Sequence, residues 1–130
     1  MGVCDYKGGA TYYHSIGQNV MVTSQKYPMR NGYFGVVSPS TGSKTRNIVS
    51  HDNLGTAKDF YDRIANGGIE KTSKGGALRI TKMHDGTVIT MRTFSHSDGT
   101  PVVEINITNS ISTGGVKQQK IHFVKGDEKR

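Results

Sequence analysis

The sequence predicts an α+β fold in which an N-terminal helix packs on one face of a twisted antiparallel β-sheet of about four to five strands. Two observations lead to this prediction. Apolar residues recur at helical spacing over residues 53–66. Four later segments alternate apolar and polar residues, with turn-forming residues between them. A helix followed by strands that neighbour one another along the chain is typical of the α+β class.

The composition limits the function classes. The chain has 130 residues, a net charge of +7, 33% apolar residues and one cysteine. No stretch approaches the ~18 apolar residues of a membrane span, and Met1–Ala10 lacks the apolar core of a signal peptide. Cys4 cannot form an internal disulfide, and no Cys or His pairs have the spacing of a structural zinc site. The basic excess favours a polyanionic partner, nucleic acid first.

Three parts are expected along the chain. Residues 1–31 are read as a linker or accessory segment, because tyrosines are scattered there among small polar residues. Within that part, Asn19–Thr23 is expected to form a short strand. Residues 32–125 form the expected domain, and the polar tail 126–130 is expected to fray.

Two strands are expected before the helix, at Gly32–Val37 and Lys44–Ser50, because β-branched and aromatic residues are frequent there. The intervening Ser-Pro-Ser-Thr-Gly sequence is typical of a turn. The core face of the helix comprises Leu54, Ala57, Phe60 or Tyr61, and Ile64.

The ends of the helix are also predicted. Either Asp52 or Ser50 can cap the first turn by accepting its free amide protons. Asn66-Gly67-Gly68 ends the helix, because glycine adopts the left-handed conformation of a C-cap. Residues 51–70 are locally acidic. That charge indicates either a solvated helix face or a helix that lies away from a basic working face.

An antiparallel meander follows the helix. The expected strands are 77–83, 87–94, 102–107 and 119–124, joined by an Asp85-Gly86 hairpin turn, a second turn at 95–99 and a Gly-rich loop through 114–115.

Alternation assigns each strand residue to a face. Leu78, Ile80 and the apolar residues of the later strands are expected to face the helix. Lys82 falls on that face by strict alternation, but it lies next to a turn and can swing outward. The opposite face is expected to carry Arg79, Thr81, Thr90, Arg92, Glu104, Asn106, Lys120 and His122.

These side chains include the types needed for RNA cleavage without a metal or other cofactor. A base removes the 2′-hydroxyl proton, an acid protonates the leaving oxygen, and cations stabilise the phosphorane-like transition state. We expect the catalytic residues to be His122, Arg92, Thr90, Lys120 and Ser95, and the RNA-binding residues to be Arg79, Lys82, Glu104 and Asn106. The simpler interpretation is a polar sheet face exposed to water, without a function of its own.

Four segments resemble one family. They are Thr56–Tyr61 (TAKDFY), Lys82–Thr87 (KMHDGT), Ser97–Ile107 (SDGTPVVEINI) and Gln119–Val124 (QKIHFV). Together they resemble the C-terminal toxin domains of bacterial polymorphic toxins, which are delivered by contact-dependent or secretion systems and belong to the barnase–EndoU–colicin–RelE-like superfamily of ribonucleases. The resemblance covers roughly residues 32–125.

The resemblance implies a helix packed on an antiparallel sheet and cleavage of tRNA or rRNA by 2′-hydroxyl attack, which leaves a cyclic phosphate. It implies a cognate immunity protein as a partner, and for some relatives a host translation factor such as elongation factor Tu. It also implies delivery by the producing bacterium and action in the target-cell cytoplasm. The resemblance assigns site roles only to residues within the matching segments, which are Lys82, Glu104, Lys120 and His122.

Two other classes stay open. A non-catalytic RNA- or protein-binding module using the same basic face predicts salt-sensitive binding without cleavage. An immunity protein is disfavoured by the charge, because inhibitors of RNA-binding toxins tend to be acidic.

Overall fold

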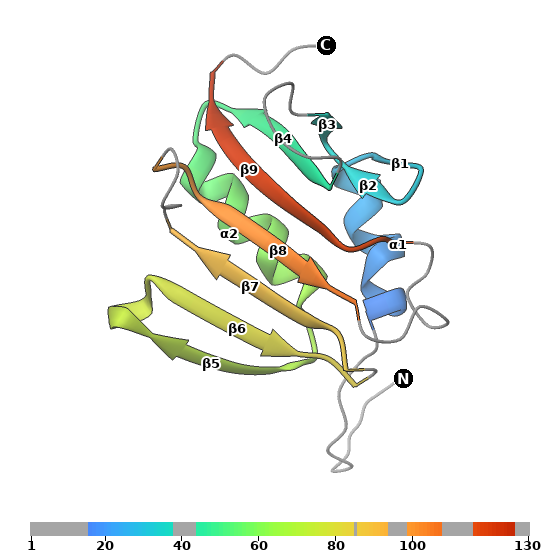
Figure 1. The fold of residues 1–130 in the computed structure, drawn as a ribbon, viewed down its shortest axis with the longest axis vertical. Helices are drawn as coiled ribbons and strands as arrows, with labels where there is room; N and C mark the ends of the chain where they lie inside the picture. Colours follow the sequence, from blue (N-terminus) through green and yellow to red (C-terminus); the bar gives the residue numbers. More distant parts are fainter. Residues whose placement is uncertain (1–15, 38–43, 85, 94–98, 108–115, 127–130) are drawn as a thin grey trace.

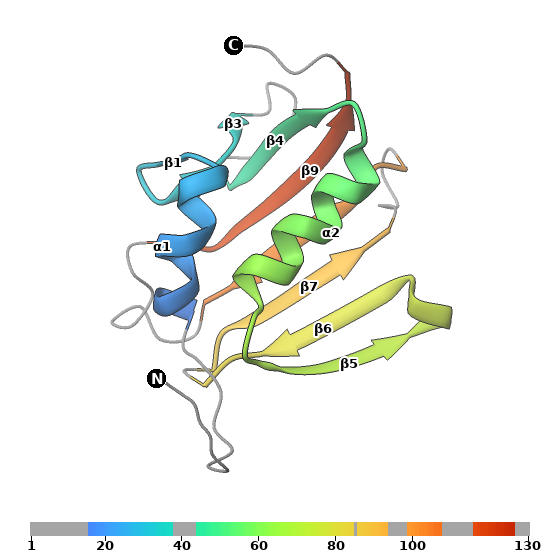
Figure 2. The same cartoon turned by 180° about the vertical axis from the view of Figure 1, so that it is seen from behind.

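A seven-stranded sheet with two helices on one face makes up most of the described chain (Figures 1 and 2). The structure is a computed structural model, and it describes residues 16–37, 44–84, 86–93, 99–107 and 116–126. The predicted α+β class is confirmed, with more strands than expected. Within these residues no helix is long and apolar enough to cross a membrane.

The elements in chain order are α1 (Ile16–Lys26), β1 (Met29–Arg30), β2 (Tyr33–Phe34), β3 (Val36–Val37), β4 (Thr45–Ser50), α2 (Asn53–Ile64), β5 (Ile69–Ser73), a short 3-10 helix η1 (Lys74–Gly76), β6 (Leu78–Lys82), β7 (Val88–Arg92), β8 (Val102–Asn106) and β9 (Gln119–Lys125). The strand order in the main sheet is β3-β4-β9-β8-β7-β6-β5, and β1 and β2 form a separate small hairpin. Figure 2 shows α2 lying across the sheet, with α1 beside it.

The strands expected at 44–50, 77–83, 87–94, 102–107 and 119–124 correspond to β4, β6, β7, β8 and β9. The expected strand Gly32–Val37 is divided into β2 and β3 at Gly35, which has a positive φ of 80°. The turn residue Asp85, the segments 38–43, 94–98 and 108–115, and the tail 127–130 lie outside the described residues.

Two features of the sheet were not predicted. β4 pairs with β9 in parallel, although the other ladders of the main sheet are antiparallel. β5 forms an edge strand in which each residue is exposed, so it lacks the apolar alternation that identifies a strand in sequence. The parallel β4–β9 ladder and the edge strand β5 are defined by pairing between segments. Periodicity within one segment does not predict such pairing.

The strand expected at Asn19–Thr23 is wrong, because this segment belongs to α1. Ile16, Val20, Thr23 and Tyr27 are buried at helical spacing. The β-branched residues of the segment favour a strand locally, but packing against α2 decides its conformation. Asn19 completes this contact by donating from Nδ2 to the carbonyl oxygens of Ile64 and Asn66 at the end of α2, both at 2.8 Å. Residues 16–26 therefore pack against α2 and contribute to the buried core.

Helix α2 forms where the periodicity predicts it. Asp52 is the N-cap and accepts from the Gly55 amide at 3.1 Å. Phe60 is fully buried, and Tyr27, Phe34 and Phe123 surround its ring with centroid distances of 5.0–5.6 Å. Tyr61, Ala57 and Ile64 are buried as well, whereas Leu54 is 37% exposed rather than part of the core.

The two helices are also joined by ionic contacts around Asp59. Its Oδ2 accepts from Tyr27 at 2.6 Å and from Arg63 at 2.8 Å, and it lies 3.1 Å from Lys26 Nζ. Partial burial raises the pKa of Asp59, but the hydrogen bonds from Arg63, Tyr27 and Lys26 outweigh it and lower the pKa to about 2.

The expected faces of β7, β8 and β9 are observed, and those of β6 are reversed. Arg79 pairs with Met91 and Thr81 pairs with Ile89, so Arg79 and Thr81 face the helix. Thr81 is 2% exposed, whereas Ile80 is 37% exposed on the opposite face. The reason is that α2 presents polar groups to β6: the Tyr61 hydroxyl forms a hydrogen bond with that of Thr81.

Candidate active site on the open face

The face of the main sheet opposite α2, here called the open face, carries a row of polar side chains across three central strands. Glu104 of β8 pairs with Thr90 of β7 on one side and with Lys120 of β9 on the other. Thr45 of β4 pairs with Lys120 and extends the row. Because directly paired residues share a face and have Cβ atoms ~5 Å apart, these side chains are neighbours.

A second row lies one step along the strands. Arg92 of β7 pairs with Val102 of β8, Val102 pairs with His122 of β9, and His122 pairs with Asn47 of β4. Arg92 and His122 therefore flank Val102, which is 1% exposed. At ~4.8 Å between strands, their backbones lie about 10 Å apart.

One ion pair links the two rows. Arg92 Nη1 donates to Glu104 Oε1 at 3.2 Å, and the two side chains are 41% and 32% exposed. An ion pair this exposed contributes little to stability. It does place a guanidinium and a carboxylate side by side on the open face.

The imidazole of His122 is more enclosed than the sequence predicts, at 6% exposed. Its Nδ1 lies 2.9 Å from the hydroxyl oxygen of Thr100, which helps to hold the ring in one orientation. Glu104 is a diagonal neighbour of His122 across the β8–β9 ladder, a relation that places their backbones ~7–8 Å apart. Thr100 was not among the expected site residues, although it lies within the segment Ser97–Ile107 and just before β8.

Two expected RNA-binding residues lie on the open face but farther from His122. Lys82 pairs with Val88, and Val88 pairs with Asn106, so both side chains belong to a third row at the other end of these strands. Asn106 lies four positions after Val102 in β8, about 13 Å along the strand. Lys82 and Asn106 therefore border the cluster rather than join it.

Arg79 does not join the site, contrary to the expectation that it shares a face with Arg92. Its guanidinium lies 4.5 Å from the Tyr61 ring centroid and pairs with Glu70 at 2.8 Å and Asp62 at 3.0 Å. Partial burial lowers the pKa of Arg79, but the two carboxylates outweigh it and raise the pKa. Burial also raises the pKa of Tyr61 well above its usual range. The remaining expected residue, Ser95, lies outside the described residues.

No protein-family model, curated protein or solved structure matches the chain. Within the described ranges, no three His, Cys, Asp or Glu side chains gather as metal ligands do. The residues of the open face define the chemistry that it can support. They offer one imidazole, one carboxylate, two cations and hydroxyl groups within two adjacent rows.

Proposed function

We propose that the chain is a metal-independent endoribonuclease that cleaves tRNA or rRNA at the open face by attack of the 2′-hydroxyl, leaving a cyclic phosphate. The main support is that His122, Glu104, Arg92 and Lys120 lie on three adjacent strands of one face. In keeping with the resemblance of four segments, the domain would act as a toxin in the cytoplasm of competitor bacteria. A cognate immunity protein would protect the producer. A host translation factor such as elongation factor Tu would assist cleavage, as the resemblance implies for some relatives.

The roles follow from the chemistry of each group. Glu104, expected from the sequence to bind RNA, lies diagonally opposite His122 and is here given a catalytic role. The two form the acid–base pair: one removes the 2′-hydroxyl proton and the other protonates the leaving 5′-oxygen. The contact between His122 Nδ1 and the Thr100 hydroxyl orients the imidazole for this role.

The cations act on the phosphate. Arg92 can present two parallel donors to the nonbridging oxygens, and its ion pair with Glu104 sets its direction before substrate arrives. Arg92 lies on β7 and Lys120 on β9, the two strands on either side of Glu104. Positive charge can therefore reach the phosphate from both of these strands. Thr90 contributes a hydroxyl that orients the phosphate, and Ser95 remains a predicted contributor. Lys82 and Asn106 contact the strand farther along.

The direct test is incubation of purified protein with total bacterial RNA in the presence of EDTA, with and without cell extract. We expect discrete RNA fragments that end in a 2′,3′-cyclic phosphate. Extract is included because it supplies host translation factors. Intact RNA under both conditions would refute the nuclease proposal.

One observation favours a second function, a non-catalytic module that binds RNA or protein through the same face. His122 is only 6% exposed, and an acid–base group has to reach the reacting oxygen. A binding module predicts salt-sensitive RNA binding without fragments. The cleavage assay, run beside a binding assay in low and high salt, separates the two.

A further inference from the structure

The reversed orientation of β6 leaves apolar side chains on the open face. Ile80 is 37% exposed there, although β6 has a neighbouring strand on each side, and Leu78 of the same strand is half-buried. On the helix face of β6, the polar residue Thr81 is buried. Burial of the apolar residue would stabilise the fold more than burial of the polar one. The exposed apolar side chains of β6 are therefore candidates for contact with a ligand.

The strand register defines the neighbours of Ile80 on the open face. Ile80 pairs with Lys71 of β5 on one side and with Thr90 of β7 on the other. Ile69 of β5 and Arg92 of β7 are its diagonal neighbours across these two ladders. Leu78 and Lys82 lie two positions away in β6 itself and so share the same face. We name this group the Ile80 patch, and it consists of Ile69, Lys71, Leu78, Ile80, Lys82 and Arg92.

The charged members of the Ile80 patch are all cations. Lys71 and Lys82 are exposed, and within the described chain neither has a carboxylate partner. Glu70, the chain neighbour of Lys71, lies on the helix face, where it pairs with Arg79 at 2.8 Å. The patch therefore combines apolar surface with positive charge, and it fits a ligand that has flat apolar groups and negative charge.

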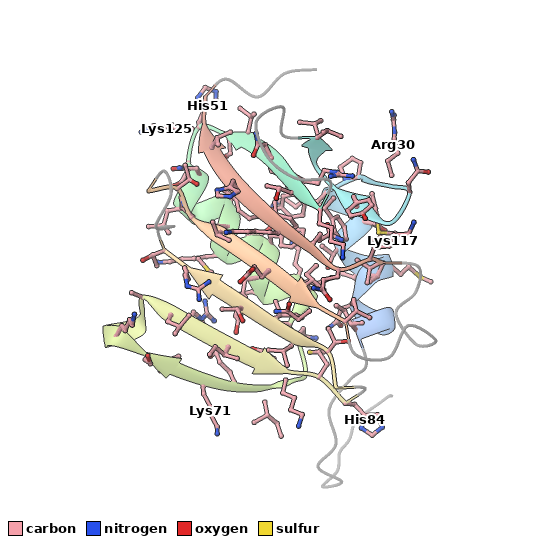
Figure 3. All side chains as sticks on the ribbon, viewed as in Figure 1. Arg30, His51, Lys71, His84, Lys117 and Lys125 are labelled. Carbon is pink, nitrogen blue, oxygen red and sulfur yellow. The ribbon has the colours of Figure 1, made fainter. Side chains whose placement is uncertain are left out.

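The other end of the open face differs in charge. The described residues of β3 and β4 that share this face are Val36, Thr45, Asn47 and Val49, and none of these four is charged. Figure 3 shows Lys71 at the β5 edge of the sheet, across from β4. A polyanion bound at the candidate active site is therefore attracted toward β6 and β5 rather than toward β4.

The Ile80 patch adjoins the candidate active site on the same face. Arg92 belongs to both, and Ile80, Thr90 and Glu104 form one row on three adjacent strands. Two strand spacings separate Ile80 from Glu104, about 10 Å, and three separate Lys71 from Glu104, about 14 Å. A nucleic-acid strand covers 14 Å with about four nucleotides at the 3.4 Å spacing of a duplex strand.

We propose that the Ile80 patch is a subsite for an unpaired nucleobase of the RNA, next to the phosphate that is cleaved. The base packs on Ile80 and Leu78, since proteins hold unstacked bases against aromatic or apolar side chains. Lys71 and Lys82 contact the phosphates that flank this base. A single RNA strand supplies both flat base faces and one negative charge per nucleotide, which is the combination that the patch fits.

The subsite selects single-stranded segments of the RNA. In a duplex each base is stacked between its neighbours, so it cannot lie flat on Ile80. The substrate class is therefore narrowed to loops and other unpaired regions. The inference rests on the proposed nuclease function for its direction, but it predicts binding that is measured without cleavage.

The experiment measures the affinity of a fluorescein-labelled twelve-nucleotide 2′-O-methyl oligouridine, which lacks the hydroxyl needed for cleavage. Ile80→Thr keeps a β-branched side chain but removes apolar surface, and it should weaken binding about 3- to 10-fold. Ile80→Tyr should tighten binding about 5-fold or more, because a base stacks well on an aromatic ring. The same oligonucleotide in a duplex with its complement should bind more weakly than the single strand.

The lysines are tested by salt dependence. Lys71→Ala should reduce the slope of log affinity against log salt by ~0.7, the value for one phosphate contact of a single strand. Lys58→Ala is the matched control, because Lys58 is an exposed lysine of α2, which covers the opposite face of the sheet. It should leave the slope unchanged. Circular dichroism checks that each variant is folded, and Lys71→Ala tests the subsite even if a change at Ile80 prevents folding.

Cleavage assays on the same proteins separate this inference from the nuclease proposal. If the protein cleaves RNA but Ile80→Thr and Lys71→Ala bind the oligouridine as Lys58→Ala does, the subsite is refuted and the nuclease stands. If both variants lose binding but no RNA is cleaved, the subsite stands and the nuclease is refuted. Vesicles that contain phosphatidylserine test a membrane as the occupant. Binding of the wild type to these vesicles but not to the oligouridine would refute the subsite.

Discussion

Arg79 and Arg92 lie on neighbouring regions of one sheet but have opposite surroundings. Arg79 lies on the helix face, where two carboxylates and the Tyr61 ring occupy its guanidinium. Arg92 lies on the open face, and its described ionic partner is Glu104. The sequence places both on one face, and only the register of β6 against β7 separates them.

The two arginines differ in how many elements of the fold their partners join. The partners of Arg79 come from α2 and β5, so its contacts hold together three elements of the fold. The partner of Arg92 lies on the adjacent strand, where the backbone ladder already joins the two. Arg92 joins no further element of the fold, and it is therefore the arginine that we propose for binding or chemistry.

The largest expected effect concerns His122, in the same row as Arg92. His122→Ala should lower kcat for RNA cleavage about 10²- to 10⁴-fold, the usual contribution of a general acid or base. His51→Ala, an exposed histidine between β4 and α2, is the matched control and should cleave normally. Initial rates on a purified tRNA measure both. Equal rates for the two variants would remove His122 from the mechanism.

The second effect compares the two arginines directly. Arg92→Ala should lower kcat about 10²- to 10³-fold, because it removes donors to the charge that develops in the transition state. Arg79→Ala should leave kcat within about twofold of the wild-type value. Arg79 lies on the helix face, so its loss removes no donor to the charge of the transition state. The same initial-rate assay applies. A large loss in Arg79→Ala with intact folding would contradict the division between the two faces.

The two arginines should differ in the reverse sense in stability. We expect Arg79→Ala to lower the free energy of unfolding by about 1–2 kcal/mol, from two partly exposed ion pairs and one cation–π contact. Arg92→Ala should change it by no more than ~0.5 kcal/mol, as for an ordinary surface residue. Urea denaturation followed by circular dichroism measures both. The comparison fails if the ranking is reversed.

The smallest effect is a pH dependence on the helix side, at Asp59. The pKa of this carboxyl is about 2 in the folded protein, below its ordinary value of 3.8. Its contribution to stability is therefore fully present above pH 3.8 and is lost as the pH falls toward 2. Asp59→Asn should flatten that part of the curve of unfolding free energy against pH. Parallel curves for the wild type and Asp59→Asn between pH 5 and 2 would show that Asp59 has no such role.

Local patterns predicted the elements that the chain encodes within one segment. The position of α2 and the strands from Leu78 onward follow from spacing and turn chemistry, whereas the structure decided between Asp52 and Ser50 as the N-cap of α2. The same patterns gave the open-face positions of Thr90, Arg92, Glu104, Lys120 and His122. They failed at α1, where β-branched residues within a helix favour a strand locally, and at β5, which has no buried face.

The α+β class, the central helix and the polar residues of one sheet face follow from the sequence, because a periodicity of 3.6 or 2 is a property of each segment. The tertiary structure alone decided which way β6 faces, since Tyr61 and Asp62 of α2 give Thr81 and Arg79 polar partners that no alternation rule anticipates. It also decided that β4 lies parallel to β9 and that Tyr33 lies beside Arg46 and Lys117. These contacts join segments far apart in the chain, and their free energy exists only when both segments are in place.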